Sequence, residues 1–478
     1  MRRIPPLLPL ALVLTLAACQ SVPLGVEQDI AAIESSLLPT FRVHGEIQPP
    51  ATVEERMQEH NVPGMSVAVY IDGELAWAKG YGIADKESGR PVTTQTLFQA
   101  ASISKPVAAT AAHDMAEDGL LNIDEDINAY LTSWTLPASA FSETEKVTIR
   151  RITNHSAGTT VWGFPGYARS AEIPDAVGVV SGGGNTDPIL VYKTPGESWQ
   201  YSGGGYTVMQ IAMADVAGTA FEDILADHVL GPMGMTSSTY EQPLPEAFWD
   251  RAATGYRQNG DEVEEKWHVY PEQAAAGLWT IPTDLGRWAL DIQQAYAGAD
   301  ATVLERETVR EMLIPEHNNH GLGPVLVAEG TQFGHGGANE GFRSYLIAAV
   351  DGSFAVAVMT NSNSGGSLYN EFLNAIFEHY EWPGREVAVR VPVEITDEER
   401  DRLAGAYEGW GLGRVSVVVE DGQLVVEAGE IVGVPIYLRP ESPTRFFGAT
   451  YGRIVEFDIE DGRATGLRMR GSRAERVD

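Results

Sequence analysis

Two similar β-hairpin patterns, placed far apart in the chain, constrain the fold most strongly. Apolar side chains alternate on both sides of Asp72-Gly73 in Ser66–Ala84, and on both sides of Asp351-Gly352 in Tyr345–Thr360. Alternation around a two-residue Asp-Gly turn is typical of a hairpin. We therefore expect an α+β domain, in which one antiparallel β-sheet flanked by helices is completed from both ends of the segment. Helical patterns lie at Pro106–Glu117, Tyr206–Ala217, Leu285–Tyr296 and Leu368–His379.

The chain divides into four parts. Residues 1–18 resemble a signal peptide, 19–50 are predicted to form a tether with a helix over Val26–Leu38, 51–385 the large α+β domain, and 397–478 a small all-β domain. In this last part, short apolar runs such as Leu403–Glu408 and Val415–Glu420 alternate with Asp-Gly turns. That spacing is typical of a small barrel or sandwich.

The N-terminus indicates export. Arg2 and Arg3 precede an apolar run, Leu7–Leu16, that is too short to span a bilayer. The sequence then reads Leu-Ala-Ala-Cys19, which resembles a bacterial lipobox, and Cys19 is the one cysteine of the chain. The resemblance implies that Cys19 is lipidated and anchors the protein to the periplasm-facing or outer side of the cell envelope. A plain secretory signal with a chance cysteine is the alternative.

Charge and metal-ligand patterns exclude several functions. With 66 acidic and 33 basic side chains, the net charge is −33, which disfavours nucleic acid as a partner. A single cysteine cannot form an intramolecular disulfide or a cysteine-rich zinc site. His317 and His320 have helical spacing for two ligands, but they follow Pro315 in a loop-like stretch. We expect that stretch to be a solvated loop and predict no metal.

The chemistry is indicated by Ser102-Ile103-Ser104-Lys105. The chain lacks the Gly-x-Ser-x-Gly and Walker patterns, and Lys105 is the only lysine with a serine three residues before it. Ser-x-x-Lys places a hydroxyl and an amine one helical turn apart on one face. A buried lysine can lose its proton and act as the base for the serine. An N-cap serine beside a solvent-facing lysine is the alternative.

Two later segments add candidates. Tyr201 lies in a Tyr-Ser-Gly-Gly-Gly run before a predicted helix, and His335-Gly336-Gly337 lies in a glycine-rich predicted strand. Glycines there let a ligand approach the strand backbone closely. Taken alone, Tyr201 reads as an ordinary half-buried tyrosine and His335 as a structural histidine.

Together and in this order, the three segments resemble those of the serine β-lactamase and penicillin-binding protein superfamily. The resemblance covers about 51–385 and is strongest to the class C β-lactamase-like branch, which includes carboxylesterases, D-stereospecific peptidases and amidases. Two further stretches, 152–158 and 276–285, also resemble that branch. It implies an antiparallel sheet flanked by helices, with a mainly helical lobe beside it.

The resemblance also implies roles for the candidates. Ser102 attacks an acyl carbon, Lys105 takes the serine proton, and Tyr201 passes a proton to the leaving group. Backbone N–H groups of Ser102 and Ala338 form the oxyanion hole, and His335, Gly336 and Gly337 help to bind substrate. Water then hydrolyses the acyl-enzyme, and no cofactor is required.

Two departures from the family pattern bear on the substrate. Gly203 stands where the family's Tyr-x-Asn has asparagine, and His335-Gly336-Gly337 replaces Lys-Thr-Gly. His335 is then expected to be a weaker, switchable partner for a substrate carboxylate. We therefore expect a small-molecule ester, amide or D-peptide substrate, with β-lactam hydrolysis ranked below ester or D-amino-acid amide hydrolysis.

Two other functions stay open, and the oligomeric state is not predicted. The first is a catalytically weak or inactive binding or sensor protein on the same fold. The second is ligand carriage by the tail, where Leu403–Tyr407 loosely resembles the lipocalin-like barrel often appended to this branch. That tail could also restrict substrates, make a dimer contact or add stability.

Overall fold

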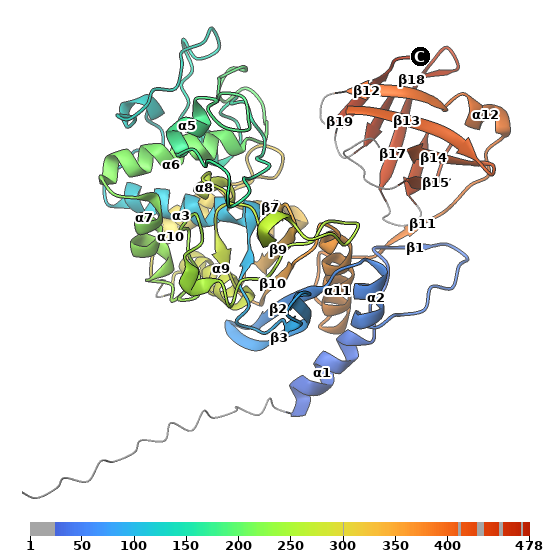
Figure 1. Cartoon of the computed structure of the whole chain (residues 1–478), viewed down its shortest axis with the longest axis horizontal. Helices are drawn as coiled ribbons and strands as arrows, with labels where there is room; N and C mark the ends of the chain where they lie inside the picture. Colours follow the sequence, from blue (N-terminus) through green and yellow to red (C-terminus); the bar gives the residue numbers. More distant parts are fainter. Residues whose placement is uncertain (1–23, 300, 410–412, 428–434, 449–452, 470–471) are drawn as a thin grey trace, which may run out of the picture.

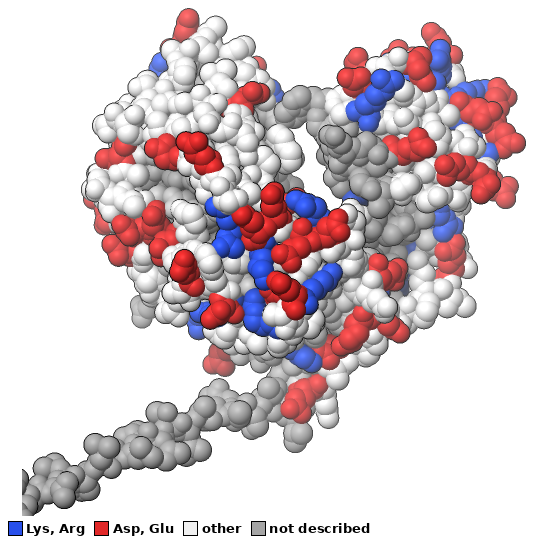
Figure 2. All heavy atoms as spheres, viewed as in Figure 1, with Lys and Arg blue, Asp and Glu red and all other residues white. Residues whose placement is uncertain are grey.

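The computed structural model describes residues 24–299, 301–409, 413–427, 435–448, 453–469 and 472–478 (Figure 1). The predicted signal peptide and Cys19 lie outside these residues. Among the residues described, none of the helices combines the length and the apolar character needed to cross a membrane. Acidic side chains are spread over both the large domain and the C-terminal domain in the view of Figure 2.

The large domain is built on a seven-stranded sheet with the order β4-β3-β2-β10-β9-β8-β7. Both predicted hairpins are present. In the first, Asp72 and Gly73 take the positive φ angles that the turn between β2 and β3 requires. Strands β2 and β10 pair antiparallel, so the two ends of the segment complete one sheet. The strands are β2 (Gly64–Ile71), β3 (Glu74–Asp85), β4 (Arg90–Pro91), β7 (Val325–Val327), β8 (Gln332–Asn339), β9 (Phe342–Ala349) and β10 (Phe354–Thr360).

Helices cover both faces of this sheet. Because side chains alternate along a strand, Val67 and Val69 pack with α11 (Gly365–His379) on one face. Tyr70 belongs to the core on the opposite face, where its hydroxyl donates to the carbonyl of Thr283 in α9 at 2.9 Å. The other sheet-covering helices are α1 (Leu24–Glu34) and α2 (Val53–Glu59) with α11, and α3 (Ser104–Glu117) and α9 (Pro282–Ala297) opposite.

A mainly helical lobe stands beside the sheet, as expected (Figure 1). Its longest helix, α6, begins after the N-cap Ser202, whose hydroxyl accepts the N–H of Gly205, and ends at the left-handed Gly218. The elements of this part are α4 (Ile149–Thr153), α5 (Ala176–Val180), α6 (Gly203–Ala217), α7 (Phe221–Leu225), α8 (Gln273–Ala276) and α10 (Arg306–Met312).

Residues 24–50 differ from the tether predicted for 19–50. Ile30 and Ile33 of α1 are buried in the same core cluster as α11, because their spacing places them on one face of the helix. Farther on, β1 (Phe41–Val43) pairs in parallel with β11 (Ala388–Arg390). This part of the chain therefore belongs to the folded structure.

The C-terminal domain is a closed antiparallel barrel of eight strands, β12–β19. Its interior is filled by the domain's own side chains, including Tyr407, Phe446 and Phe457, as expected for a barrel of this size. Such filling weighs against ligand carriage. The strands are β12 (Gly405–Gly409), β13 (Gly413–Glu420), β14 (Gln423–Glu427), β15 (Ile436–Pro440), β16 (Arg445–Gly448), β17 (Ile454–Glu460), β18 (Arg463–Met469) and β19 (Ser472–Arg476), preceded by α12 (Asp397–Asp401).

Candidate active site

Ser102 sits on a sharp turn between a strand and a helix. Strand β5 (Phe98–Gln99) leads into a 3-10 turn, Ala101–Ile103, and α3 follows directly. Ala101 has a φ of +52°, a left-handed conformation that is unusual for a residue with a side chain. The nearby Ser104 is fully buried, and its hydroxyl donates to Ala101 O at 2.6 Å. Ser102 is only half-buried, so it is the serine of the motif that a substrate can reach.

Lys105 is placed to act on Ser102. Its Nζ lies 3.1 Å from Ser102 Oγ and 2.7 Å from the carbonyl oxygen of Ala275 in α8. The side chain is 2% exposed, and burial lowers the pKa of its ammonium to about 7. A large fraction is therefore neutral near pH 7, which a general base requires.

Tyr201 lies next to both Lys105 and Ser102. The lysine Nζ lies 5.0 Å from the centroid of the Tyr201 ring. Burial raises the pKa of the Tyr201 phenol, while a hydrogen bond with Ser102 acts in the other direction. The phenol therefore keeps its proton near neutral pH and has one to pass on.

Strand β8 forms the wall beside Ser102. Strand β7 pairs only with Gln332–Gly334, so β8 has no β7 partner from His335 onward, and its following residues lie against the Ser102 turn. A Cβ added at Gly337 would lie 2.1 Å from Ala100 O, which shows how closely the two backbones approach. Ala338 is exposed on this segment.

Two histidines that were not predicted as active-site residues belong to the same cluster. The His155 ring packs against that of Tyr201 with ring centroids 4.2 Å apart, and His155 Nδ1 accepts the N–H of Ser202 at 3.2 Å. It therefore fixes the turn that carries Tyr201. His320 is also buried, with its ring 5.1 Å from His155 and 6.5 Å from His335.

The expectation of a solvated loop at His317–His320 is wrong for His320. Asn318 and Asn319 both take positive φ angles and form a tight turn, in which His320 N–H donates to His317 O at 2.9 Å. The turn directs His320 into the cluster and leaves its two asparagines exposed. Pro315 and the asparagines predict a loop, but they do not show which side chain points inward.

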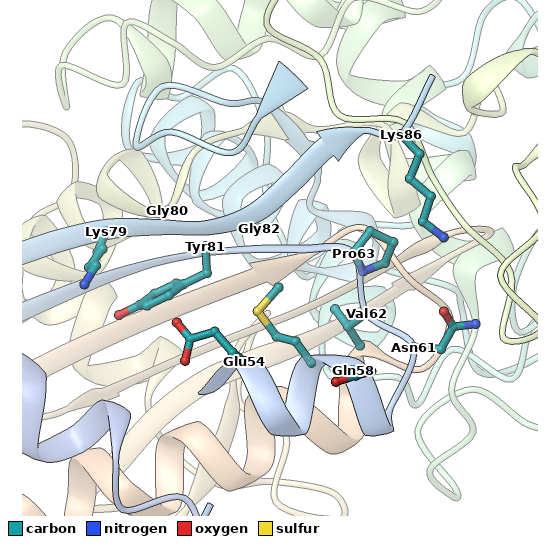
Figure 3. Close-up of a pocket in the computed structure, with 11 residues that line it drawn as sticks. Glu54, Gln58, Asn61, Val62, Pro63, Lys79, Gly80, Tyr81, Gly82 and Lys86 are labelled. Atoms are coloured by element: carbon teal, nitrogen blue, oxygen red, sulfur yellow. The ribbon is translucent and has the colours of Figure 1, made fainter. Parts of the chain in front are cut away.

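Two other features lie away from Ser102. Within the described residues, Asp114, Asp118 and His228 are close enough to share a cation, but they lie toward the far end of α3, and His228 Nδ1 already pairs with Asp114 at 2.7 Å. A cavity of about 500 Å³ lies between α2 and β3 (Figure 3). Its lining includes Met57, Tyr81 and none of the three motif segments.

Together, the fold and the clustered serine, lysine and tyrosine are those of an acyl-transferring serine hydrolase. The β-lactamase family model matches residues 50–377, and the chain belongs to that family. The superfamily indicated by the sequence is therefore confirmed, and the protein is a serine hydrolase of the β-lactamase and penicillin-binding protein type.

The similarity to individual relatives extends beyond this domain. The chain is 25% identical over 440 residues to penicillin-binding protein 4* of Bacillus subtilis (strain 168), which covers 86% of this chain and 94% of the relative. The octameric penicillin-binding protein homologue from Pyrococcus abyssi has a TM-score of 0.60 at 22% identity, over 88% of this chain and 98% of that one. The D-amino acid amidase from Ochrobactrum anthropi SV3, complexed with L-phenylalanine amide, has a TM-score of 0.55 at 22% identity. That match covers 74% of this chain and 99% of the amidase chain.

Proposed function

We propose that the protein hydrolyses small esters or D-amino-acid amides through an acyl-enzyme on Ser102. The observation that carries this proposal is the buried amine of Lys105, whose Nζ lies 3.1 Å from Ser102 Oγ. An amine with a pKa of about 7 in that position can accept the hydroxyl proton as the serine attacks.

The remaining groups fit the later steps. Attack of Ser102 Oγ on the acyl carbon forms a tetrahedral oxyanion, which the N–H groups of Ser102 and Ala338 would stabilise. Tyr201 would give its proton to the leaving group and regain one from Lys105. Water, activated by the same pair, then releases the acid and restores Ser102.

The surroundings of Gly203 support an ester or amide over a β-lactam. A Cβ added at Gly203 would lie 3.0 Å from the ring of Phe164 and 3.2 Å from Trp162 O. The Phe164 ring therefore occupies the space beside the position where the family pattern has an asparagine. An apolar wall replaces an amide there, and Trp162 is 63% exposed next to it. Such a wall suits an apolar or aromatic substrate group.

We also propose that the protein is exported and anchored by a lipid on Cys19, which rests on the lipobox resemblance alone. A Cys19→Ala variant should move from the membrane fraction to the soluble fraction and lose the mass of the lipid. An unchanged membrane fraction and mass would contradict the anchor.

The test of the hydrolase is p-nitrophenyl butyrate turnover by the wild-type protein and by Ser102→Ala. The expected loss is on the order of a million-fold if the three groups act as a unit. Ser35→Ala is the control, because Ser35 is exposed directly after α1 and its hydroxyl donates to backbone carbonyls of that helix. Equal turnover by Ser102→Ala would refute the proposal, and stable acylation of Ser102 without turnover would favour the binding or sensor function.

A further inference from the structure

The protonation of His335 is fixed by its neighbours. Its Nδ1 lies 2.6 Å from the carbonyl oxygen of Gly336, and because a carbonyl only accepts, Nδ1 must carry a proton. Burial, and then the charge of Lys105, lower the pKa of His335 to about 3. The imidazole is therefore neutral near pH 7, and its Nε2 presents a lone pair.

The lone pair of His335 Nε2 accepts no hydrogen bond within the described part of the chain. His335 is 6% exposed, and its Nε2 is buried without a hydrogen-bond partner among the residues that the structure describes. A buried polar atom without a partner is uncommon in a folded protein and calls for a ligand or water that completes it. The missing partner must be a hydrogen-bond donor.

The acceptor atom, His335 Nε2, belongs to a ring on the leaving-group side of Ser102. The His335 ring centroid is 6.3 Å from that of Tyr201, the group proposed to protonate the leaving atom. His335 also precedes Ala338, the proposed oxyanion residue, by three positions on β8. A substrate held between Ser102 and Ala338 therefore brings its leaving group toward His335.

We propose that His335 makes this side of the site a receptor for an uncharged leaving group that bears an N–H, such as a primary amide or an amide-capped peptide, and that it rejects a carboxylate. The proposal rests on the proposed function and reverses the expectation that His335 partners a substrate carboxylate. A carboxylate carries only acceptors, so it would leave Nε2 unsatisfied and lose its own hydration. An amide N–H satisfies Nε2 directly.

The preference for the amide over the carboxylate should be largest at pH 8 and should narrow toward pH 5.5. The titratable groups around His335 are Lys105 of α3, Tyr201 before α6, and His320 and His155 from the neighbouring loops. Burial is the largest cause that lowers the pKa of both other histidines. Lys105, with a pKa of about 7, becomes an ammonium toward pH 5.5, and this cation attracts a carboxylate but not an uncharged amide. The preference for the amide is therefore tested at pH 8, where Lys105 is mostly neutral.

The test is calorimetric binding of a matched pair to the full-length Ser102→Ala protein. The pair is D-phenylalanyl-D-alaninamide and D-phenylalanyl-D-alanine, which differ in the terminal carboxylate. We expect the amide to bind at least about tenfold more tightly at pH 8, which is the effect of one good hydrogen bond. Equal binding, tighter binding of the carboxylate, or binding of neither compound at pH 8 would overturn the proposal.

Variants of His335 separate its role from simple structural damage. In the Ser102→Ala background, His335→Leu should reduce the amide preference to about threefold or less, while His335→Gln keeps an acceptor oxygen and should retain most of it. His44→Leu is the control, because His44 is exposed near β1. A full preference in His335→Leu would refute the assignment. Since binding is measured without turnover, failure of the hydrolase would show separately, in the p-nitrophenyl butyrate assay.

Discussion

Replacing Lys105 by methionine is expected to abolish hydrolysis and to raise stability at neutral pH. Burial lowers the pKa of Lys105 from 10.5 to about 7. Between these values the unfolded chain binds a proton that the folded chain does not, so stability rises with pH across this window. Lys105 therefore lowers the free energy of unfolding most at and below pH 7. Methionine has a similar shape and no charge to bury.

The size of the effect follows from the pKa values and the two hydrogen bonds. Linkage puts the cost of burying Lys105 at about 4 kcal/mol at pH 7 and about 1 kcal/mol at pH 10. Methionine gives up the bonds to Ser102 Oγ and Ala275 O, at about 1 kcal/mol each. The variant should therefore be about 2 kcal/mol more stable at pH 7 and about 1 kcal/mol less stable at pH 10. At neutral pH this corresponds to a rise in Tm of about 2 to 4 °C.

The assay is thermal unfolding at both pH values, with p-nitrophenyl butyrate turnover measured in parallel. Lys146→Met is the control, because Lys146 is exposed and also donates to two backbone carbonyls, those of Ser142 and Glu143. It should show no gain at pH 7. If Lys105→Met is destabilised equally at both pH values, the lysine is charged in the folded protein and cannot be the base.

Three further predictions concern the site and the core. The plot of kcat/KM against pH should rise with a midpoint near 7, as neutral Lys105 forms; a midpoint near 4 would indicate a carboxylate base instead. Gly203→Asn should lower Tm without creating penicillin hydrolysis, because its Cβ meets the Phe164 ring at 3.0 Å. Adding Phe164→Ala should recover part of the Tm, and no recovery would contradict that contact. Glu371→Gln should cost about 2 kcal/mol in urea unfolding, because it removes the buried carboxylate that pairs with Arg56 and leaves the exposed Glu59 as the remaining carboxylate partner of Arg56. Burial opposes ionisation of Glu371, but hydrogen bonds from Arg56 and His60 hold its pKa below the usual value. Its contribution is therefore lost as the pH falls through that lowered pKa, and stability that is unchanged in the variant at pH 7 would refute the assignment.

The fold could be predicted where the signals are local. Each hairpin places its alternation and its Asp-Gly turn within one short segment, and the need to bury both hairpins joins β2 to β10. The pairing of β1 with β11 gives no such signal. Each strand has only three residues, and they lie far apart in the sequence, so only the folded structure brings them together.

The contacts of the site also divide into those set by local sequence spacing and those that only the folded structure reveals. Ser102 and Lys105 are linked by helical spacing, so their contact could be predicted from four consecutive residues. The contact of His155 with Tyr201 spans two loops, and that of His320 depends on the turn made by Asn318 and Asn319. Side-chain periodicity carries no information about these loops, because neither belongs to a regular element that would fix a face.

The proposed catalysis and the proposed specificity of this site have one physical cause. Burial makes Lys105 a base, and it also keeps His155, His335 and Tyr201 uncharged at neutral pH. A carboxylate placed about 6 Å from the lysine would stabilise the ammonium by about 3 kcal/mol at an effective dielectric constant of about 20, or about two pKa units. Nearly all of the lysine would then be protonated at neutral pH, and the base would be lost. An uncharged amide leaves the pKa of Lys105 where it is, so a site that uses a desolvated lysine without a compensating cation must also select an uncharged leaving group.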